Sequence, residues 1–62
     1  MQDMTAYLEK LRTDAAECAL IRDLATDRRK RELFTRLTEH LNALASEMEA
    51  AIAAKLDDER RV

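Results

Sequence analysis

The chain has 62 residues with no glycine and no proline, and 39% of its residues are charged while 47% are hydrophobic. This length excludes a multidomain protein, and the absence of the usual turn-forming residues excludes folds built from repeated β-hairpins. The net charge of −2 at pH 7 lacks the basic excess of a non-specific nucleic-acid-binding protein, so the composition predicts long amphipathic helices with mixed surface charges.

The first predicted helix covers about residues 3–25. Its apolar side chains recur at spacings of three and four residues, which is the period of one helix face. The pattern ends near Leu24 or Ala25, and no glycine follows to close the helix. The members of this apolar stripe are Met4, Leu8, Leu11, Ala15, Cys18 and Ala25.

A turn is predicted at residues 26–27. The seven residues 26–32 contain no apolar side chain, and the apolar repeats before and after them are out of phase by two residues. Asp27 or Thr26 can cap a helix that begins at about residue 28, because either side chain can accept a backbone N–H, and Asp27 is the favoured candidate. Two ion pairs with i, i+4 spacing are expected in the first turns, Asp27–Arg31 and Glu32–Arg36.

The second predicted helix covers about residues 28–58. Leu33, Ala45 and Ile52 widen its apolar stripe on one side, as in the helices of a bundle. The helix is longer than the first by two turns or more, which leaves an apolar overhang at residues 51–56. The stripe itself has heptad spacing and consists of Phe34, Leu37, Leu41, Leu44, Met48 and Ala51.

These elements predict an all-α fold in which residues 1–62 form a single antiparallel helical hairpin. A core of this size is small, and one cysteine excludes an internal disulfide, so we expect the hairpin to dimerise into a four-helix bundle. Parallel and antiparallel dimers both remain open. The residues expected at the oligomer or partner interface are Leu8, Leu11, Cys18, Phe34, Leu37, Leu41, Leu44, Met48, Ile52 and Leu56.

Catalytic chemistry has little support in the sequence. His40 is the only histidine, and the positions three and four residues before it are Leu37 and Arg36, so a helical metal-ligand pair is missing. Cys18 lies in mid-helix on the apolar stripe, where a small buried hydrophobe is expected. We therefore expect neither an enzyme nor a metal or cofactor, and we expect a cytoplasmic protein with no membrane span.

The basic run Arg28, Arg29, Lys30 and Arg31 is the one charged motif that suggests a ligand. Four cations at a helix N-terminus oppose the helix dipole, and they form a possible contact for an anion. The main functional hypothesis is a structural or interaction module that self-associates or binds a protein partner. The alternative is a small RNA- or DNA-binding regulator that uses this run, although few aromatic residues are available for stacking on bases.

The sequence resembles a group of short uncharacterised bacterial two-helix proteins. The matching residues are the segment 15–21 (AAECALI), the turn 25–27 (ATD), and Arg31, Leu37, Leu44 and Ala45. Arg28 and Leu41 depart from the group, which commonly has proline and an aromatic residue at these positions. The resemblance implies the hairpin and no activity. The architecture also resembles the Rop-type dimeric hairpin, but Glu9 stands where that family has its key phenylalanine, so its RNA-binding function is not implied.

Overall fold

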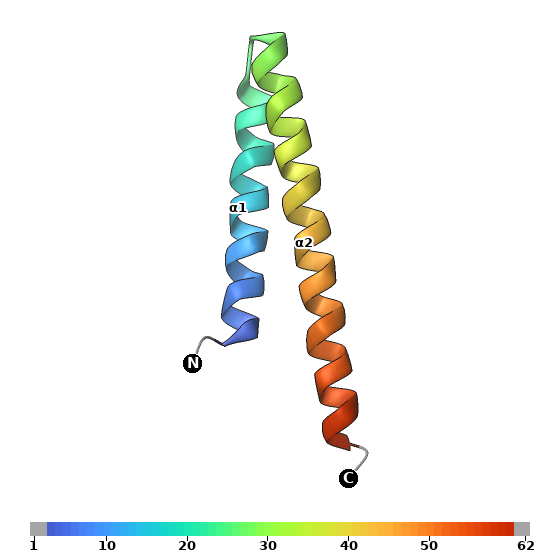
Figure 1. Cartoon of the computed structure of the whole chain (residues 1–62). Helices are drawn as coiled ribbons and strands as arrows, with labels where there is room; N and C mark the ends of the chain where they lie inside the picture. Colours follow the sequence, from blue (N-terminus) through green and yellow to red (C-terminus); the bar gives the residue numbers. More distant parts are fainter. Residues whose placement is uncertain (1–2, 61–62) are drawn as a thin grey trace.

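The computed structural model describes residues 3–60 and contains two α-helices, α1 (Met4–Leu24) and α2 (Arg28–Arg60). The helices lie side by side in an antiparallel hairpin with extents of 54 × 17 × 14 Å (Figure 1). The expected all-α, two-helix fold is confirmed. Compared with the expected ranges, α1 starts one residue later and ends one residue earlier, and α2 continues two residues further. Residues 1–2 and 61–62 of the expected 1–62 unit lie outside the described residues.

The hairpin turns without glycine because its backbone needs no left-handed residue. Helix α1 ends at Leu24, and its C-cap Ala25 has φ −70° and ψ 130°. The N–H of Ala25 donates to the carbonyl of Arg22 at 3.3 Å. No residue in the described range has a positive φ. An extended residue at the helix end therefore replaces the left-handed cap that glycine commonly supplies.

Asp27 is confirmed as the N-cap of α2. Its Oδ1 accepts the backbone N–H of Arg29 at 3.3 Å, and its carbonyl accepts the N–H of Arg31 at 3.0 Å. The two expected ion pairs, however, are wrong. Arg31 donates from Nη2 to the carbonyl of Ala25 at 2.9 Å, and Glu32 pairs with Arg28 at 3.3 Å. Arg31 thus satisfies a carbonyl that the end of α1 leaves without an intrahelical partner.

Replacing Arg31 with methionine is expected to lower the free energy of unfolding by about 1–2 kcal/mol, because the part-buried Ala25 carbonyl loses a charged donor. Arg29→Met is the matched control, since the Arg29 side chain makes no hydrogen bond or ion pair within residues 3–59. Urea unfolding of both variants tests the role of Arg31. Equal losses would show that the guanidinium does not hold the turn.

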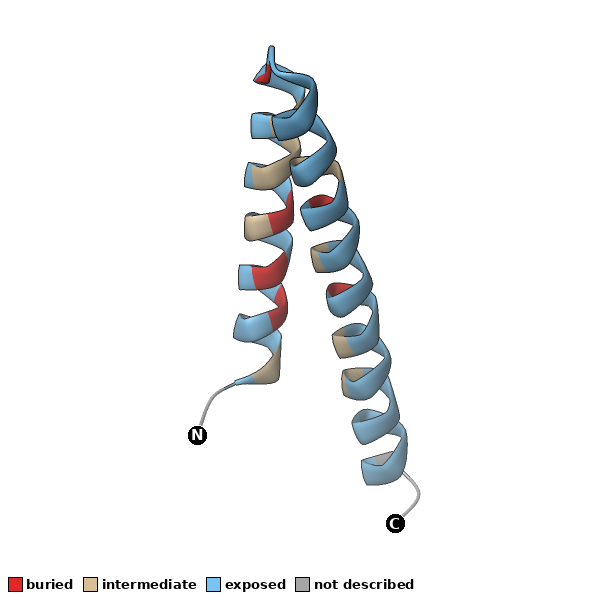
Figure 2. Ribbon diagram, turned by 45° about the horizontal axis from the view of Figure 1, so that its top comes forward, coloured by how far each residue is buried: buried red, intermediate tan, exposed pale blue. Residues whose placement is uncertain are grey.

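On α1, the apolar stripe predicted from the sequence faces α2. Leu8, Leu11 and Ala15 are buried in the helix, and Ala25 is buried just after it. Met4 and Cys18 are half-buried on the same stripe. Figure 2 shows the buried positions on the side of each helix that faces the other. The spacing therefore identified the correct face of α1.

On α2, the predicted stripe was only half correct. Phe34, Leu41 and Met48 are half-buried toward α1 as expected, but Leu37, Leu44 and Ala51 are exposed. The positions one residue further along take their place: Thr38 and Ala45 are buried, and Ile52 is half-buried.

Small side chains explain this choice of face on α2. Ala45 packs against Leu8 and Leu11, so the two helices approach closely, and Thr38 is satisfied because its hydroxyl donates to the carbonyl of Phe34 at 2.7 Å. A larger leucine at either position would hold the helices further apart. Leu37 and Leu44, which the sequence pattern assigned to the core, are therefore left outside it.

Candidate interaction surface

An apolar face runs along one long side of the hairpin, beside the contact between the helices. On α2, Leu37 and Leu44 each precede a buried residue by one position, and on α1 Tyr7 precedes the buried Leu8. In an antiparallel helix pair, the positions just before the core residues of both helices lie on the same side. We call this surface the outer apolar face and define it by five exposed residues: Tyr7, Ile21, Leu33, Leu37 and Leu44.

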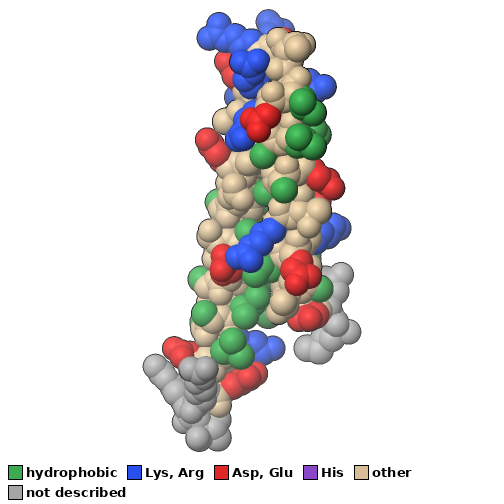
Figure 3. Space-filling model, turned by 180° about the vertical axis from the view of Figure 1, so that it is seen from behind, with side chains coloured by type: hydrophobic (Ala, Val, Ile, Leu, Met, Phe, Trp, Pro, Cys, Tyr) green, Lys and Arg blue, Asp and Glu red, His purple; other side chains and the backbone are tan. Residues whose placement is uncertain are grey.

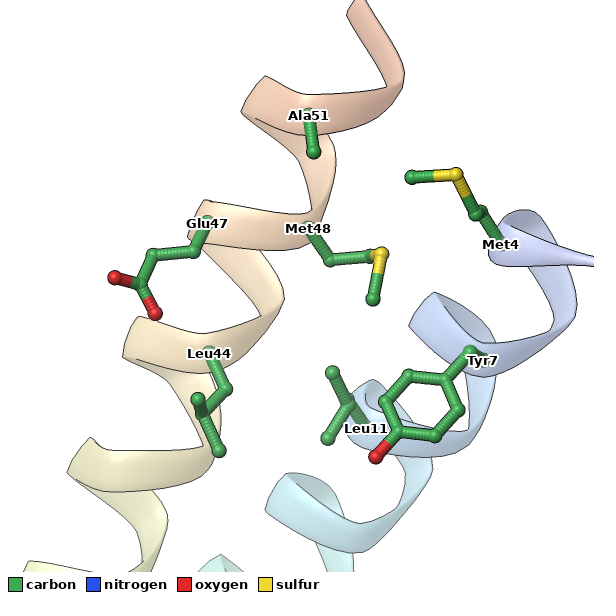
Figure 4. A pocket seen from close by; sticks show the side chains of 7 residues that line it. All are labelled: Met4, Tyr7, Leu11, Leu44, Glu47, Met48 and Ala51. Carbon is green, nitrogen blue, oxygen red and sulfur yellow. The ribbon is translucent and has the colours of Figure 1, made fainter.

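A hollow of about 300 Å³ opens on this face toward the N-terminal end of α1. Figure 4 shows Met4 and Met48 pointing toward one another across it, while the carboxylate of Glu47 turns away. The floor and walls are therefore almost entirely apolar. The residues that line the hollow are Met4, Tyr7, Leu11, Leu44, Glu47, Met48 and Ala51.

The opposite long side of the hairpin is charged. Arg12 and Glu49 form an ion pair of 2.7 Å that connects α1 to α2, and both side chains are about half exposed. Further along, a second hollow is lined by Lys55 and Glu59 together with Leu56. Solvated charges of this kind are stable in water, whereas a row of leucines is not, so the two sides differ in their need for a partner.

The structure divides the interface residues predicted from the sequence into three groups. Leu37 and Leu44 lie on the outer apolar face, and Leu56 lies on the charged side near the end of α2. Tyr7, Ile21 and Leu33 were not among the predicted residues. Their spacing was a usable signal, because Tyr7 and Leu33 each come one residue before a stripe residue and Ile21 comes four residues before Ala25. The others line the contact between α1 and α2 of one hairpin: Leu8, Leu11, Cys18, Phe34, Leu41, Met48 and Ile52.

The basic run is partly occupied by contacts within the hairpin. Arg31 holds the Ala25 carbonyl and Arg28 pairs with Glu32, so within residues 3–59 the side chains of Arg29 and Lys30 alone in this run lack such a contact. Figure 3 shows Lys and Arg side chains gathered at the turn end, with acidic side chains among them. The run is therefore not a single cluster of four equivalent cations.

The side chains that could act in catalysis or bind a metal do not cluster in the described part of the chain. Cys18 is half-buried against α2, and His40 is exposed. Within residues 3–60, no group of three or more His, Cys, Asp or Glu residues is placed to hold a metal ion. Neither of the two helices in that range has the length and apolar character needed to cross a membrane.

Comparisons with known proteins find no relative of this chain. The chain matches no family model, no curated protein and no solved structure. The resemblance to bacterial two-helix proteins and to the Rop-type hairpin therefore rests on the residues named above and on the two-helix architecture.

Proposed function

We propose that the protein is a self-associating structural module whose outer apolar face packs against the same face of a second copy. The product is a four-helix bundle that presents its charged sides to solvent and to further partners. The observation that carries this proposal is the exposure of Leu37 and Leu44 beside a contact between α1 and α2 that does not bury them. A bundle helix needs such a second apolar row, whereas an isolated helix pair does not.

The solvent-exposed area of the hairpin supports a partner that is as large as a second hairpin. The chain exposes 5231 Å², whereas a compact monomer of 7.2 kDa exposes about 4100 Å² by the usual scaling with mass. The excess is about 1100 Å², and a standard stable interface removes about 800 Å² from each partner. A second hairpin laid along the long axis covers an area of this order.

The internal core supports the same conclusion. Only five hydrophobic residues of the described range are buried, and in that range no large side chain is fully buried. A 62-residue chain without a disulfide has little other means of stabilising two long helices. Self-association buries more apolar surface without needing a disulfide. The outer apolar face is suited to it because both helices contribute apolar residues to that face.

Light scattering across a hundredfold dilution, with helicity followed by circular dichroism, tests this proposal. We expect a mass of twice 7.2 kDa at the highest concentration, with mass and helicity falling together on dilution. A mass of 7.2 kDa and full helicity at every concentration would overturn the proposal.

A further inference from the structure

We propose that the two copies lie with their turns at opposite ends, so that the hollow of each receives the turn-proximal part of the other's outer apolar face. This inference rests on the proposed self-association and adds the orientation and register of the second copy. It identifies the occupant of the hollow as apolar side chains near the partner copy's turn, above all Ile21 and Leu37.

The outer apolar face has two unlike ends. Near the turn, Ile21, Leu33 and Leu37 are exposed and stand out from the helices. At the other end, Tyr7 and Leu44 form part of the wall of the 300 Å³ hollow. Between the two ends, Asp14 occupies the α1 position that is seven residues from both Tyr7 and Ile21, so it lies on the same side of the helix.

Two arrangements bring these faces together around a two-fold axis. With both turns at the same end, each hollow faces the other hollow, and the exposed Arg28, Arg29 and Lys30 of both copies gather at one end of the bundle. With the turns at opposite ends, each hollow faces exposed leucine and isoleucine side chains, and the two basic runs are far apart. The second arrangement fills each hollow and keeps the two basic runs apart, so the structure favours it.

The residue spacing fits this arrangement on both helices at once. Leu37 of one copy pairs with Leu44 of the other about a midpoint between residues 40 and 41, and Tyr7 pairs with Ile21 about a midpoint at Asp14. The two midpoints must lie at one level of the hairpin for a single axis to pass through both. They do so approximately, because Leu11, one turn of α1 from Asp14, belongs to the cluster against which Leu41 packs.

A consequence is that the two Asp14 carboxylates approach one another at the axis. Asp14→Asn removes this repulsion, and we expect it to lower the Kd of the dimer about threefold to fivefold. A change of this size corresponds to the interaction between two partly exposed charges. Glu9→Gln is the matched control, since Glu9 is an exposed acid elsewhere on α1. With both turns at one end, each Asp14 would instead face α2 of the second copy, and an unchanged or weaker dimer would contradict the proposed orientation.

Spin labels at the turn measure the orientation directly. In a Cys18→Ala background, a label on Thr26→Cys is expected to give a distance of about 36 Å between the two copies, because each turn lies about 12 helical residues from the axis. A distance below about 20 Å in a protein of dimeric mass would overturn the orientation and leave self-association standing. A monomeric mass in unlabelled protein would overturn the proposed function itself.

Discussion

Replacing Leu41 with aspartate is expected to abolish the cooperative unfolding transition. Leu41 packs against the buried cluster of Leu8, Leu11 and Ala45, at the middle of the contact between α1 and α2. A carboxylate at this half-buried position is partly desolvated among apolar side chains, which costs about 4 kcal/mol or more together with the lost packing. A loss of this size is comparable with the whole stability of a small helical domain.

Thermal melts followed by circular dichroism check this prediction. Asn42→Asp is the matched control, because it adds the same charge at the neighbouring, exposed position of α2. We expect Asn42→Asp to melt within a few degrees of the original protein and Leu41→Asp to show no transition. A native-like transition in Leu41→Asp would show that this residue does not lie between the helices.

Replacing Leu44 with glutamate is expected to separate the two copies of the proposed dimer. Leu44 is 45% exposed in the hairpin, so the change leaves the contact between α1 and α2 largely intact. In the dimer, each copy loses a buried leucine and gains a carboxylate in an apolar contact. The combined effect is about 4 kcal/mol, or roughly a thousandfold in Kd.

Leu56→Glu is the matched control for this effect. Leu56 is 53% exposed on the same helix but lies on the charged side of the hairpin. The same substitution there shows whether a glutamate on the charged side also weakens the dimer. Analytical ultracentrifugation of both variants separates the two faces. Dissociation by Leu56→Glu with an intact Leu44→Glu dimer would place the interface at the apolar end of α2, where the sequence pattern alone suggested an overhang.

The two helices and the turn between them follow from local properties of the chain. Apolar residues at helical spacing, seven consecutive residues without an apolar side chain, and an aspartate able to accept backbone N–H groups are enough to place α1, the turn and α2 within two residues. The inward face of α1 follows in the same way, because Met4, Leu8, Leu11, Ala15 and Cys18 keep alternating spacings of four and three residues. Local hydrogen bonding and helical periodicity depend on neighbours in sequence, so they can be read without knowing the partner helix.

The face of α2 that meets α1 was decided only when the two helices packed. Phe34, Leu41 and Met48 belong to two overlapping stripes, one completed by Leu37 and Leu44 and the other by Thr38 and Ala45. Hydrophobicity favours the first stripe, but close approach of two backbones favours the second, since a small side chain at the contact lets the opposite leucines fill the space. The same choice determined the candidate site, because turning the small residues inward leaves Leu37 and Leu44 on the surface for a partner.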